Sequence, residues 1–527
     1  MKKLIIPIAF LLLGFQNFII AQSAEILDVR KKEFRGVHPI INKATGKAEG
    51  YYTFYVNEKI GGGKINFVIM IYDLELNVIK QTPVTMSKGS TVEASVYNGN
   101  DFFFIFRDLG RKQLSYVTID SKGDIIKTKG IKENKWGEVE ADVFPSTNGG
   151  FFLIKPIKDK KWGYTIERVD REINTKWLKQ FVPERGYVFV EAIESRGDQI
   201  MVVQIAMETR MSKKAQGRLI AFDDKDGKEV FSYPLFDGTV TCIPSAFRID
   251  DEKNIVTSGM YFEGEKWQGD NSDGIFFLRL SPEGKKMVYV KEDWNAGIQK
   301  VLKDNKNKGV LGTKPKVYFH EIIEKPNGYQ VIGETFRTVV KAAGMMGGLA
   351  GTISNIKDRV TGSYIGDPDS QGEGASGSLG FNIEDFVIFD FNKEGVMTNM
   401  SIIKKDVVKV TVYQPYAGLG GLRLARIVDA HGFFGFAFTT ELVDTKQQVL
   451  VSDNMTDKDP YIGVNTIEEG KVSETHKILI KRRTARMSSN KESDFVGVVK
   501  SKPGFICVYY YDKEVESVNL YLEQIKL

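Results

Sequence analysis

The sequence predicts an all-β protein made of one small antiparallel module repeated many times. The module is clearest from Thr91 to Lys127, TVEASVYNGNDFFFIFRDLGRKQLSYVTIDSKGDIIK. Thr91 to Tyr97, Phe102 to Arg107 and Leu114 to Ile119 are rich in β-branched and aromatic residues, and Asn98-Gly99 is a hairpin turn signal. A further turn leads into Asp124 to Lys127, a short fourth strand. Such a unit has two apolar faces to bury, so it needs neighbouring copies of itself.

A turn after the third strand recurs along the chain and is the second observation behind this prediction. The first five copies of the turn are 47 to 57 residues apart, which is the spacing of propeller blades with four strands each. Insertions account for the two longer gaps that follow. The seven turns begin at Asp73, Asp120, Asp170, Asp224, Ser281, Asn392 and Ile467.

A recurring hairpin before the third strand is the third observation, and it indicates eight units. The eight hairpins are VHPIINKATGKAEGYYTFYV, VEASVYNGNDFFFIF, VEADVFPSTNGGFFLI, VFVEAIESRGDQIMVVQI, CIPSAFRIDDEKNIVTSGM, VYFHEIIEKPNGYQVIGET, LRLARIVDAHGFFGFAF and FVGVVKSKPGFICVYY. The last is followed only by Ser517 to Leu527, one strand, so we expect Glu25 to Val29 to supply the missing fourth strand. Joining the two ends hides edge strands. We therefore predict a single β-propeller over residues 22–527, with eight blades favoured over seven and an open or two-part all-β array as the alternative.

The first 21 residues have the form of a secretory signal peptide. Lys2 and Lys3 precede an apolar run from Leu4 to Leu13, and Ala21 is the expected cleavage position. A retained membrane anchor is the alternative, but the apolar run is short for a span. Removing the two lysines changes the formal charge from +5 to +3, so a nucleic-acid partner is not expected. The mature chain is expected to be a monomer without a membrane span.

Two segments interrupt the repeats. Asp293 to Leu302 has a capping residue and apolar residues at helical spacing, which predicts a short helix on one face of the propeller. A glycine-rich insertion at about 341–380 falls between the second and third strands of the sixth unit. Within the insertion, the segment from Asp367 to Glu373 resembles the first half of a calcium loop, but position twelve is Ser378 and not a glutamate. An acidic solvated linker is the favoured interpretation, and no cofactor is predicted.

Two cysteines, Cys242 and Cys507, lie in apolar strand patterns of widely separated units. Buried thiols are the favoured interpretation, with a long-range disulfide as the alternative.

The candidate site is a set of carboxylates at one apparent register of the first strands. In a propeller these strands line the central channel, so equal registers would form one ring around the axis. Four carboxylates on a ring repel one another unless a cation, protonation or paired arginines and lysines neutralise them. Binding of a ligand, paired-carboxylate hydrolysis and a structural role in hydrogen bonding all remain open at this point. The candidate ligand-binding residues are Glu93, Glu140, Glu191, Glu321, His38 and His320.

The sequence favours a binding module over an enzyme. A reaction centre needs unlike groups in unlike environments, whereas these glutamates are repeated. The four histidines come from different units, and no metalloprotease, nucleophile-elbow, phosphate-loop or Cys-x-x-Cys motif is present. We predict no catalytic residues, no metal ligands and a binding or interaction module that recognises a glycan, a peptide or an envelope protein at the channel mouth. A hydrolase or lyase acting on an extracellular polymer is the alternative.

The turn and hairpin repeats, together with the Ala21-Gln22 end of the signal segment, resemble exported β-propeller proteins of the uncharacterised kind found in Bacteroidota. This resemblance implies a propeller fold and an exported protein, and it transfers no active-site residues. Because the third strand of the last unit runs to the final residues, we expect the periplasm rather than the extracellular medium.

Overall fold

A computed structural model gives the arrangement of most of the chain. It describes residues 23–29, 34–42, 45–108, 110–132, 142–158, 162–209, 212, 214–265, 272–304, 315–340, 379–412, 421–430, 432–443, 447–454, 461–468, 471–479, 496–512 and 515–527. The predicted signal peptide, residues 341–378 of the predicted insertion, the calcium-loop candidate from Asp367 and the candidate site residue Glu140 lie outside the described residues.

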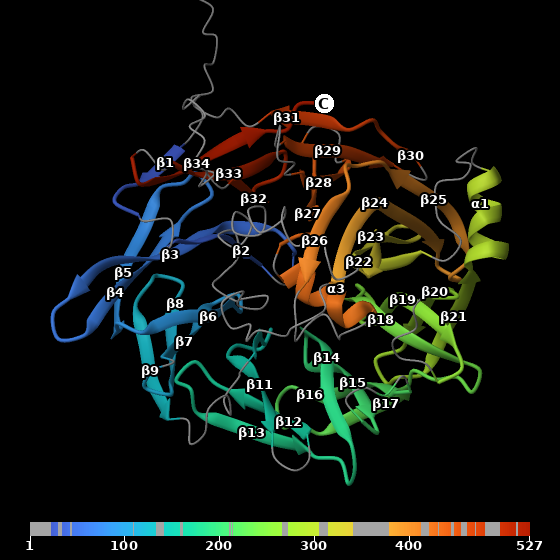
Figure 1. Cartoon of the computed structure of the whole chain (residues 1–527), viewed down its shortest axis with the longest axis horizontal. Coiled ribbons are helices and arrows are strands. Elements are labelled where there is room, and N and C mark those ends of the chain that lie inside the picture. The colour runs from blue at the N-terminus through green and yellow to red at the C-terminus, as the bar shows by residue number, and fades with distance from the viewer. Residues whose placement is uncertain are drawn as a thin grey trace, which may run out of the picture.

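The described strands form seven hydrogen-bonded sheets placed around a common centre (Figure 1). Two four-stranded sheets come first, with β2 (Phe34–Ile41), β3 (Ala48–Ile60), β4 (Lys64–Tyr72) and β5 (Val78–Ser87), then β6 (Ser90–Tyr97), β7 (Asp101–Asp108), β8 (Gln113–Asp120) and β9 (Ile125–Lys132). An eight-stranded sheet follows, with β10 (Asp142–Pro145), β11 (Phe151–Lys158), β12 (Trp162–Val169), β13 (Thr175–Phe181), β14 (Tyr187–Arg196), β15 (Gln199–Met207), β16 (Gln216–Asp223) and β17 (Glu229–Pro234).

The second half of the chain continues in the same way. The next four-stranded sheet holds β18 (Val240–Ile249), β19 (Ile255–Glu263), β20 (Gly274–Leu280) and β21 (Lys286–Asp293). Two five-stranded sheets contain β22 (Lys316–Lys325), β23 (Gly328–Val340), β24 (Leu379–Asn392), β25 (Met397–Ile403) and β26 (Val408–Val412), then β27 (Phe436–Glu441), β28 (Gln448–Asn454), β29 (Tyr461–Glu468), β30 (Lys471–Val472) and β31 (His476–Leu479). The last sheet has the order β1 (Ser23–Ile26), β34 (Ser517–Gln524), β33 (Phe505–Asp512) and β32 (Val496–Lys500).

The recurring turns connect third to fourth strands, as predicted, wherever the structure describes them. At Asp120 the carboxylate accepts hydrogen bonds from the backbone N–H groups of Lys122, at 3.0 Å, and Asp124, at 2.8 Å. Gly123 has a φ of 86°, the left-handed conformation that favours glycine. The same side-chain bonds recur at Asp73 and Asp170. The turn is therefore defined by an acceptor side chain that folds back onto its own backbone.

Seven of the eight predicted hairpins form, and the seventh is wrong. The segment predicted as its first strand, 422–428, is part of helix α3 (Gly421–Ala430), and the first strand of that sheet is β27. The run Leu-Arg-Leu-Ala-Arg-Ile-Val alternates well enough to suggest a strand. Its apolar residues Leu422, Ala425 and Val428 also recur every three positions, which places them on one face of a helix.

The N-terminal strand completes the last sheet, which confirms the predicted meeting of the two ends. β1 pairs antiparallel with β34, with Glu25 opposite Asn519. The N–H of Val29 then donates to the carbonyl of Glu516 at 2.7 Å. Ile26 and Val29 are 4% and 0% exposed, so this short segment contributes to the core between the first and last sheets.

Neighbouring sheets pack face to face through aromatic side chains. Phe102 and Phe104 on β7 point toward the β2–β5 sheet, where the ring of Tyr52 lies 5.0 Å from that of Phe102. Phe103 points the other way and meets Phe151 on β11 at 4.9 Å. Each of these phenylalanines is 0% exposed, and burying one such side chain contributes roughly 1.5–3 kcal/mol. The aromatic side chains of β7 therefore pack between neighbouring repeats.

The predicted helix after β21 forms but lies elsewhere than expected. The carboxylate of Asp293 caps a π-helical turn, η2 (Trp294–Ile298), which continues into α1 (Gln299–Asp304). Trp294 is 1% exposed and anchors the turn in the core. α1 contacts β25 at the outer edge of the ring of sheets, not on one of its faces (Figure 1). Trp294 donates its indole N–H to the hydroxyl of Ser272 at 2.9 Å and lies in a core cluster with residues of β20 and β22, which accounts for this position.

The strands β23 and β24 flank residues 341–378, as predicted for the insertion. Their pairing continues to Val340 and Leu379, and β26 adds to β24 along Leu379 to Ile383. Cys242 and Cys507 are both buried and form no disulfide, which confirms the favoured prediction. Within the described part of the chain, every helix is too short or too polar to cross a membrane.

Candidate functional site around helix α3

Two of the predicted glutamates occupy equivalent β-bulges. Glu93 lies in the register shift between Val92 and Ala94 of β6, and Glu191 lies in the shift between Val190 and Ala192 of β14. A bulge adds one residue without a partner on the neighbouring strand, and this turns its side chain away from the regular alternation. Both carboxylates are therefore placed by the same local distortion of an inner strand.

The bulges correct the predicted register. In β22 the shift falls between Phe319 and Glu321, so His320 and not Glu321 matches Glu93 and Glu191. In β18 the corresponding residue is Ser245. His38 also does not match, because the shift in β2 ends at Val37. The predicted register came from aligning the repeated glutamates. The observed register depends instead on the position of the bulge residue in each first strand.

The predicted carboxylates have separate partners. Glu93 pairs with Nε of Arg107 at 2.7 Å, and Glu191 pairs with a guanidinium nitrogen of Arg426 at 2.9 Å. Glu321 accepts a hydrogen bond from the hydroxyl of Thr439 at 2.8 Å. Pairing with an arginine, one of the predicted ways to neutralise repelling carboxylates, is thus present at Glu93 and Glu191. His38 stacks on Tyr52, with ring centres 5.0 Å apart.

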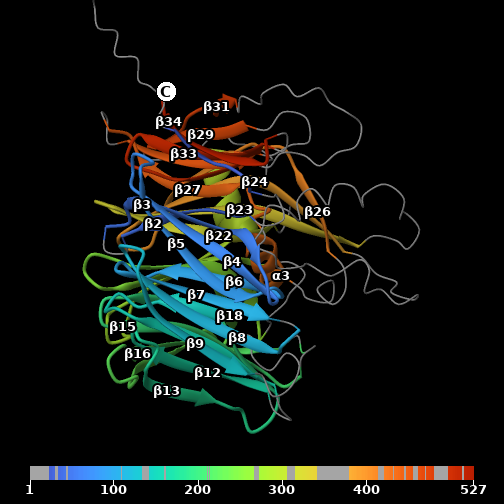
Figure 2. The ribbon, with the colours of Figure 1, turned by 90° about the vertical axis from the view of Figure 1, so that its left-hand side faces the viewer.

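Helix α3, which the sequence did not reveal, contacts two of the predicted residues, Glu191 and His320. The helix lies inside the ring of sheets, on the same side as β26 (Figures 1 and 2). Four of its apolar residues are at most 4% exposed and pack into a large core cluster, together with residues of β18 and β22. These buried residues are Leu422, Leu424, Ala425 and Val428.

The polar face of α3 connects three inner strands. Arg426 pairs with Glu191 on β14 and donates to the carbonyl of Pro244 on β18 at 3.0 Å. One turn later, Asp429 accepts a hydrogen bond from the hydroxyl of Tyr318 on β22 at 3.1 Å. Residues three apart share a helix face, so one short surface of α3 holds all three contacts.

Behind Asp429 lies a fully buried charge cluster. Glu334 is 0% exposed and forms an ion pair with Lys405. Its carboxylate also accepts hydrogen bonds from the backbone N–H groups of Phe436, at 2.7 Å, and Gly435, at 3.2 Å. Burial alone would raise the pKa of Glu334, but the charge of Lys405 and the neighbouring His320 outweigh it and hold the pKa at about 2.

His320 links the buried cluster to α3. Its Nε2 lies 3.2 Å from Glu334 and its Nδ1 lies 3.7 Å from Asp429. The imidazole stacks on Phe436 at 4.8 Å and meets the edge of Tyr318 at 5.0 Å. Burial raises the pKa of Tyr318, which keeps its hydroxyl protonated as the donor to Asp429.

Exposure decides which of these groups can reach a ligand. The side chain of Asp429 is 38% exposed, whereas those of His320 and Glu334 are 4% and 0% exposed. The accessible group is therefore a carboxylate, and the buried groups hold it in place. Among the described residues, no three His, Cys, Asp or Glu side chains are grouped as metal ligands.

A second buried carboxylate lies further along β22. Burial raises the pKa of Glu321, and burial lowers the pKa of nearby Lys500. Both shifts favour the neutral forms of the two groups. The attraction between the two groups opposes both shifts.

Comparison with known proteins places the sequence in a family. Residues 1–526 match the model of a "Family of unknown function (DUF6770)". The chain belongs to this family. No curated protein matches the sequence.

Solved structures resemble this DUF6770 protein weakly in fold. A prolyl endopeptidase has a TM-score of 0.40 and 10% identity, over 92% of this chain and 56% of that chain. An oligogalacturonate lyase in complex with manganese has a TM-score of 0.35 and 12% identity, over 93% and 98% of the two chains. The Nup133 β-propeller domain of Vanderwaltozyma polyspora has a TM-score of 0.34 and 8% identity, over 90% and 99%. The DUF6770 chain thus spans about half the length of the prolyl endopeptidase, and similarities this weak assign no activity.

Proposed function

We propose that this protein is an eight-bladed, closed β-propeller that acts as a non-enzymatic binding module. The eight-stranded sheet supports this count, because β10–β13 and β14–β17 are joined only through one parallel pair, Trp162 with Tyr187. Counting the two halves separately gives eight units of at least four strands, the last of which includes β1.

Polar contacts between consecutive sheets support closure. The first and last sheets are bridged by Lys502 and Glu75 at 2.5 Å. Further bridges are Lys80–Asp124 at 2.9 Å, Arg171–Asp101 at 2.9 Å, Arg168–Asp224 at 2.6 Å and Tyr329–Asp250 at 2.8 Å. A closed ring leaves no exposed sheet edge at the junction of the chain ends.

The surface of α3 that carries Arg426 and Asp429 is the proposed binding site. The observation that carries this proposal is the partly exposed carboxylate of Asp429, held by Tyr318 and backed by the ion pair of Glu334 and Lys405. Burial raises the pKa of Asp429, and the nearby His320, the hydrogen bond from Tyr318 and the charge of Arg426 oppose that rise. A carboxylate at a surface accepts hydrogen bonds, and its strongest partners are guanidinium and ammonium groups. A peptide or envelope protein that presents arginine or lysine is therefore favoured over a neutral glycan.

Acid–base catalysis is not proposed for this site. Both oxygens of Glu334 are engaged, and its low pKa keeps it ionised and unable to donate a proton at neutral pH. Burial raises the pKa of Asp429, but paired-carboxylate hydrolysis also needs a second carboxylate that reaches the substrate, and the nearby Glu334 is 0% exposed.

Asp429→Asn tests the proposed site, because it removes the charge while leaving an oxygen for Tyr318. The probes are an array of short peptides with and without arginine and lysine, and a glycan array. We expect binding to the basic peptides, and a loss of about tenfold or more in Asp429→Asn. Glu172→Gln, an exposed carboxylate at a turn on the other face, is the matched control and is expected to bind like the wild type.

Two results would count against this assignment. If Asp429→Asn and Glu172→Gln weaken peptide binding equally, the binding depends on the overall charge of the surface and not on a site at Asp429. Binding confined to neutral glycans and insensitive to Asp429→Asn would assign recognition to another surface.

We also propose that residues 1–21 are removed on export and that the mature protein acts in the periplasm. The apolar run after Lys2 and Lys3 supports this. N-terminal sequencing of the protein recovered from cell fractions is expected to begin at Gln22 in the periplasmic fraction. Recovery in the cytoplasm with Met1 retained would refute it.

A further inference from the structure

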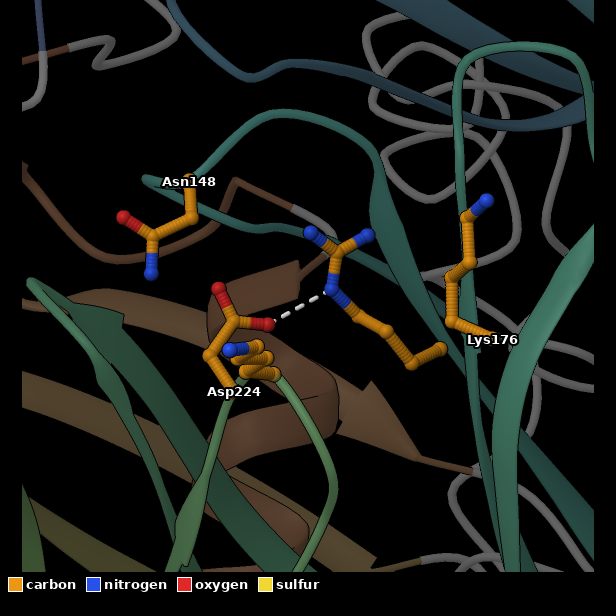
Figure 3. A pocket seen from close by; sticks show the side chains of 5 residues that line it. Asn148, Lys176 and Asp224 are labelled. Carbon is orange, nitrogen blue, oxygen red and sulfur yellow. Dashed lines mark hydrogen bonds and ion pairs between the residues drawn. The ribbon is translucent and has the colours of Figure 1, made fainter.

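A cleft lies on the opposite face of the molecule from α3, between the β10–β13 and β14–β17 halves of the large sheet (Figure 3). Its volume is about 460 Å³, enough for a small organic molecule. It is formed where the β10–β11 hairpin turn and the β16–β17 turn meet, at the ends of the strands away from the bulges. The lining residues are Asn148, Arg168, Lys176, Asp224 and Lys225.

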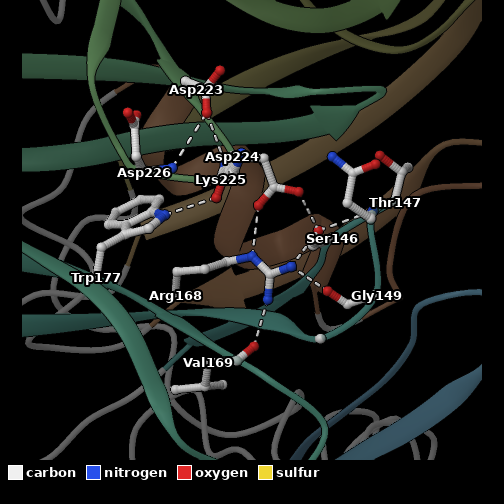
Figure 4. Close-up of polar contacts among 12 residues, drawn as sticks. Ser146, Thr147, Gly149, Arg168, Val169, Trp177, Asp223, Asp224, Lys225 and Asp226 are labelled. Carbon is white, nitrogen blue, oxygen red and sulfur yellow. Dashed lines mark hydrogen bonds and ion pairs between the residues drawn. The ribbon is translucent and has the colours of Figure 1, made fainter.

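The floor of the cleft is a buried ion pair that is fully engaged within the protein (Figure 4). Nε of Arg168 donates to Asp224 at 2.6 Å, and the hydroxyl of Ser146 donates to the other oxygen of Asp224, also at 2.6 Å. Arg168 further donates to the carbonyls of Val169 and Gly149. These side chains are 7%, 2% and 0% exposed for Arg168, Asp224 and Ser146. The floor is therefore rigid before any ligand arrives.

The backbone around the floor is shaped for this pair. A Cβ atom on Gly150 would lie 2.3 Å from a guanidinium nitrogen of Arg168. Trp177 on β13 donates its indole N–H to the carbonyl of Asp224 at 2.7 Å, which fixes the position of the turn that carries Lys225. This hydrogen bond and the Arg168–Asp224 ion pair join the two halves of the sheet beside the cleft.

The rim of the cleft, formed by Asn148, Lys176 and Lys225, carries hydrogen-bond donors above the Arg168–Asp224 ion pair. Asn148 and Lys176 stand on opposite sides of the Arg168–Asp224 pair (Figure 3). Lys176, whose side chain is 55% exposed, also pairs with Asp170 at 2.9 Å, and Lys225 is exposed. The five lining side chains include three cations and one carboxylate, and both oxygens of that carboxylate already accept hydrogen bonds.

We propose that this cleft binds an oxyanion, a carboxylate or sulfate group of a small ligand, through Lys176, Lys225 and the amide of Asn148. Ammonium and amide N–H groups recognise such oxygens, and charge-assisted hydrogen bonds of this type are about twice as strong as neutral ones. Because both oxygens of Asp224 are engaged, the groups left for a ligand are the ammonium groups of Lys176 and Lys225 and the amide of Asn148. This site is independent of the α3 surface and extends the proposed function to a second ligand class.

Isothermal titration calorimetry with sodium sulfate and with sodium glucuronate tests the proposal, with glucose as the uncharged analogue of glucuronate. Saturable one-site binding is expected for at least one anion and not for glucose. Binding of glucuronate alone would identify a carboxylated ligand, and binding of sulfate alone a sulfated one. In Lys225→Gln and in Lys176→Gln we expect the Kd of the bound anion to rise about tenfold.

Lys122→Gln is the matched control, since Lys122 is an exposed lysine in the equivalent turn of an earlier repeat, away from the cleft. It is expected to leave the Kd unchanged, and thermal melting of all three variants checks that the fold is intact. The proposal is overturned if neither anion binds saturably, or if glucose binds as well as glucuronate. It is also overturned if Lys122→Gln weakens binding as much as Lys225→Gln does.

Discussion

At the scale of single residues, stability depends on a few buried polar groups, each of which needs particular neighbouring residues. Arg168 needs a close backbone approach from Gly149 and Gly150, and Glu334 needs the charge of Lys405. A buried charge that loses its partner costs much more than an exposed one, because water cannot replace the lost interaction.

Gly150→Ala is expected to destabilise the protein more than Gly149→Ala. Both glycines are left-handed, with φ of 78° and 76°, so both substitutions carry a backbone cost of roughly 1–2 kcal/mol. Only the Cβ at position 150 would collide with Arg168 and the carbonyl of Val169, whereas position 149 has nothing within 4 Å. We expect a further loss of roughly 1–3 kcal/mol for Gly150→Ala. Urea unfolding measures both, and equal losses would refute the packing argument.

Glu334→Gln is expected to lower the free energy of unfolding at pH 7 by about 3 kcal/mol, because it leaves Lys405 buried without its counter-charge. The folded pKa of about 2 lies below the usual 4.5. The stabilising contribution of the carboxylate is therefore fully present above pH 4.5 and decreases as the pH falls toward 2.

The difference between wild type and Glu334→Gln should accordingly shrink as the pH is lowered from 5 to 3. Urea unfolding at several pH values measures it. Glu172→Gln, with its exposed side chain, should differ little from wild type at any of these pH values. A difference for Glu334→Gln that stays constant or grows in acid would contradict the assignment of the shift.

At the scale of secondary-structure elements, α3 is the feature that distinguishes one part of the repeat from the others. It precedes β27 and takes the place expected for a first strand. Its polar face contacts β14, β18 and β22, which belong to three different sheets. A ten-residue helix has little stability alone, so these contacts and its buried apolar face must hold it.

A double-mutant cycle with Glu191→Gln and Arg426→Gln measures how strongly α3 is held to β14. The side chains are 3% and 18% exposed, so we expect a coupling energy of about 1–3 kcal/mol. Lys80 and Asp124 form a matched exposed pair, with side chains 43% and 65% exposed, for which a coupling below about 1 kcal/mol is expected. Similar coupling in both pairs would show that α3 is not anchored by this contact.

At the scale of the whole molecule, stability depends on the meeting of two strands that are nearly five hundred residues apart. β1 covers one edge of β34, and Ile26 is buried with Val518 and Leu520. Each sheet packs against its two neighbours through apolar faces. Loss of β1 would therefore leave an edge of β34 unpaired and would also expose apolar surface of the adjacent sheet.

Deleting Ser23–Ile26 is expected to lower the free energy of unfolding by at least about 2 kcal/mol, since the burial of Ile26 is lost. The exposed edge of β34 should also cause concentration-dependent association. Differential scanning calorimetry and light scattering measure these effects. Removing Lys526 and Leu527, of which Leu527 is 56% exposed, is the control and should have little effect. A deletion variant that melts and scatters light like the wild type would show that β1 is dispensable.

Much of the fold could be predicted because its signals are local. A hairpin turn, an aspartate that folds back on its own backbone and a run of β-branched residues each act within a few positions, and they repeat. The pairing of β1 with β34 could also be predicted, because a missing strand at one end and a spare strand at the other are both visible in the sequence.

The candidate site could be predicted only in part. Glu93 and Glu191 were found because they repeat at one position of the unit, whereas His320 shares their bulge and was aligned one residue away. Arg426, Asp429 and Glu334 carried no repeated signal. Their partners lie on other sheets, more than ninety residues away in most cases, so no local pattern could identify them.

The sequence by itself determined the all-β architecture, the repeated unit and the strands that join the chain ends, because turn chemistry and apolar alternation act over short distances. Only the tertiary structure decided that 422–428 is a helix, which glutamate faces which arginine, and where two turns enclose a cleft. Those outcomes depend on which surfaces meet after the sheets have packed, and the free energy of such contacts is set by burial and not by any short stretch of sequence.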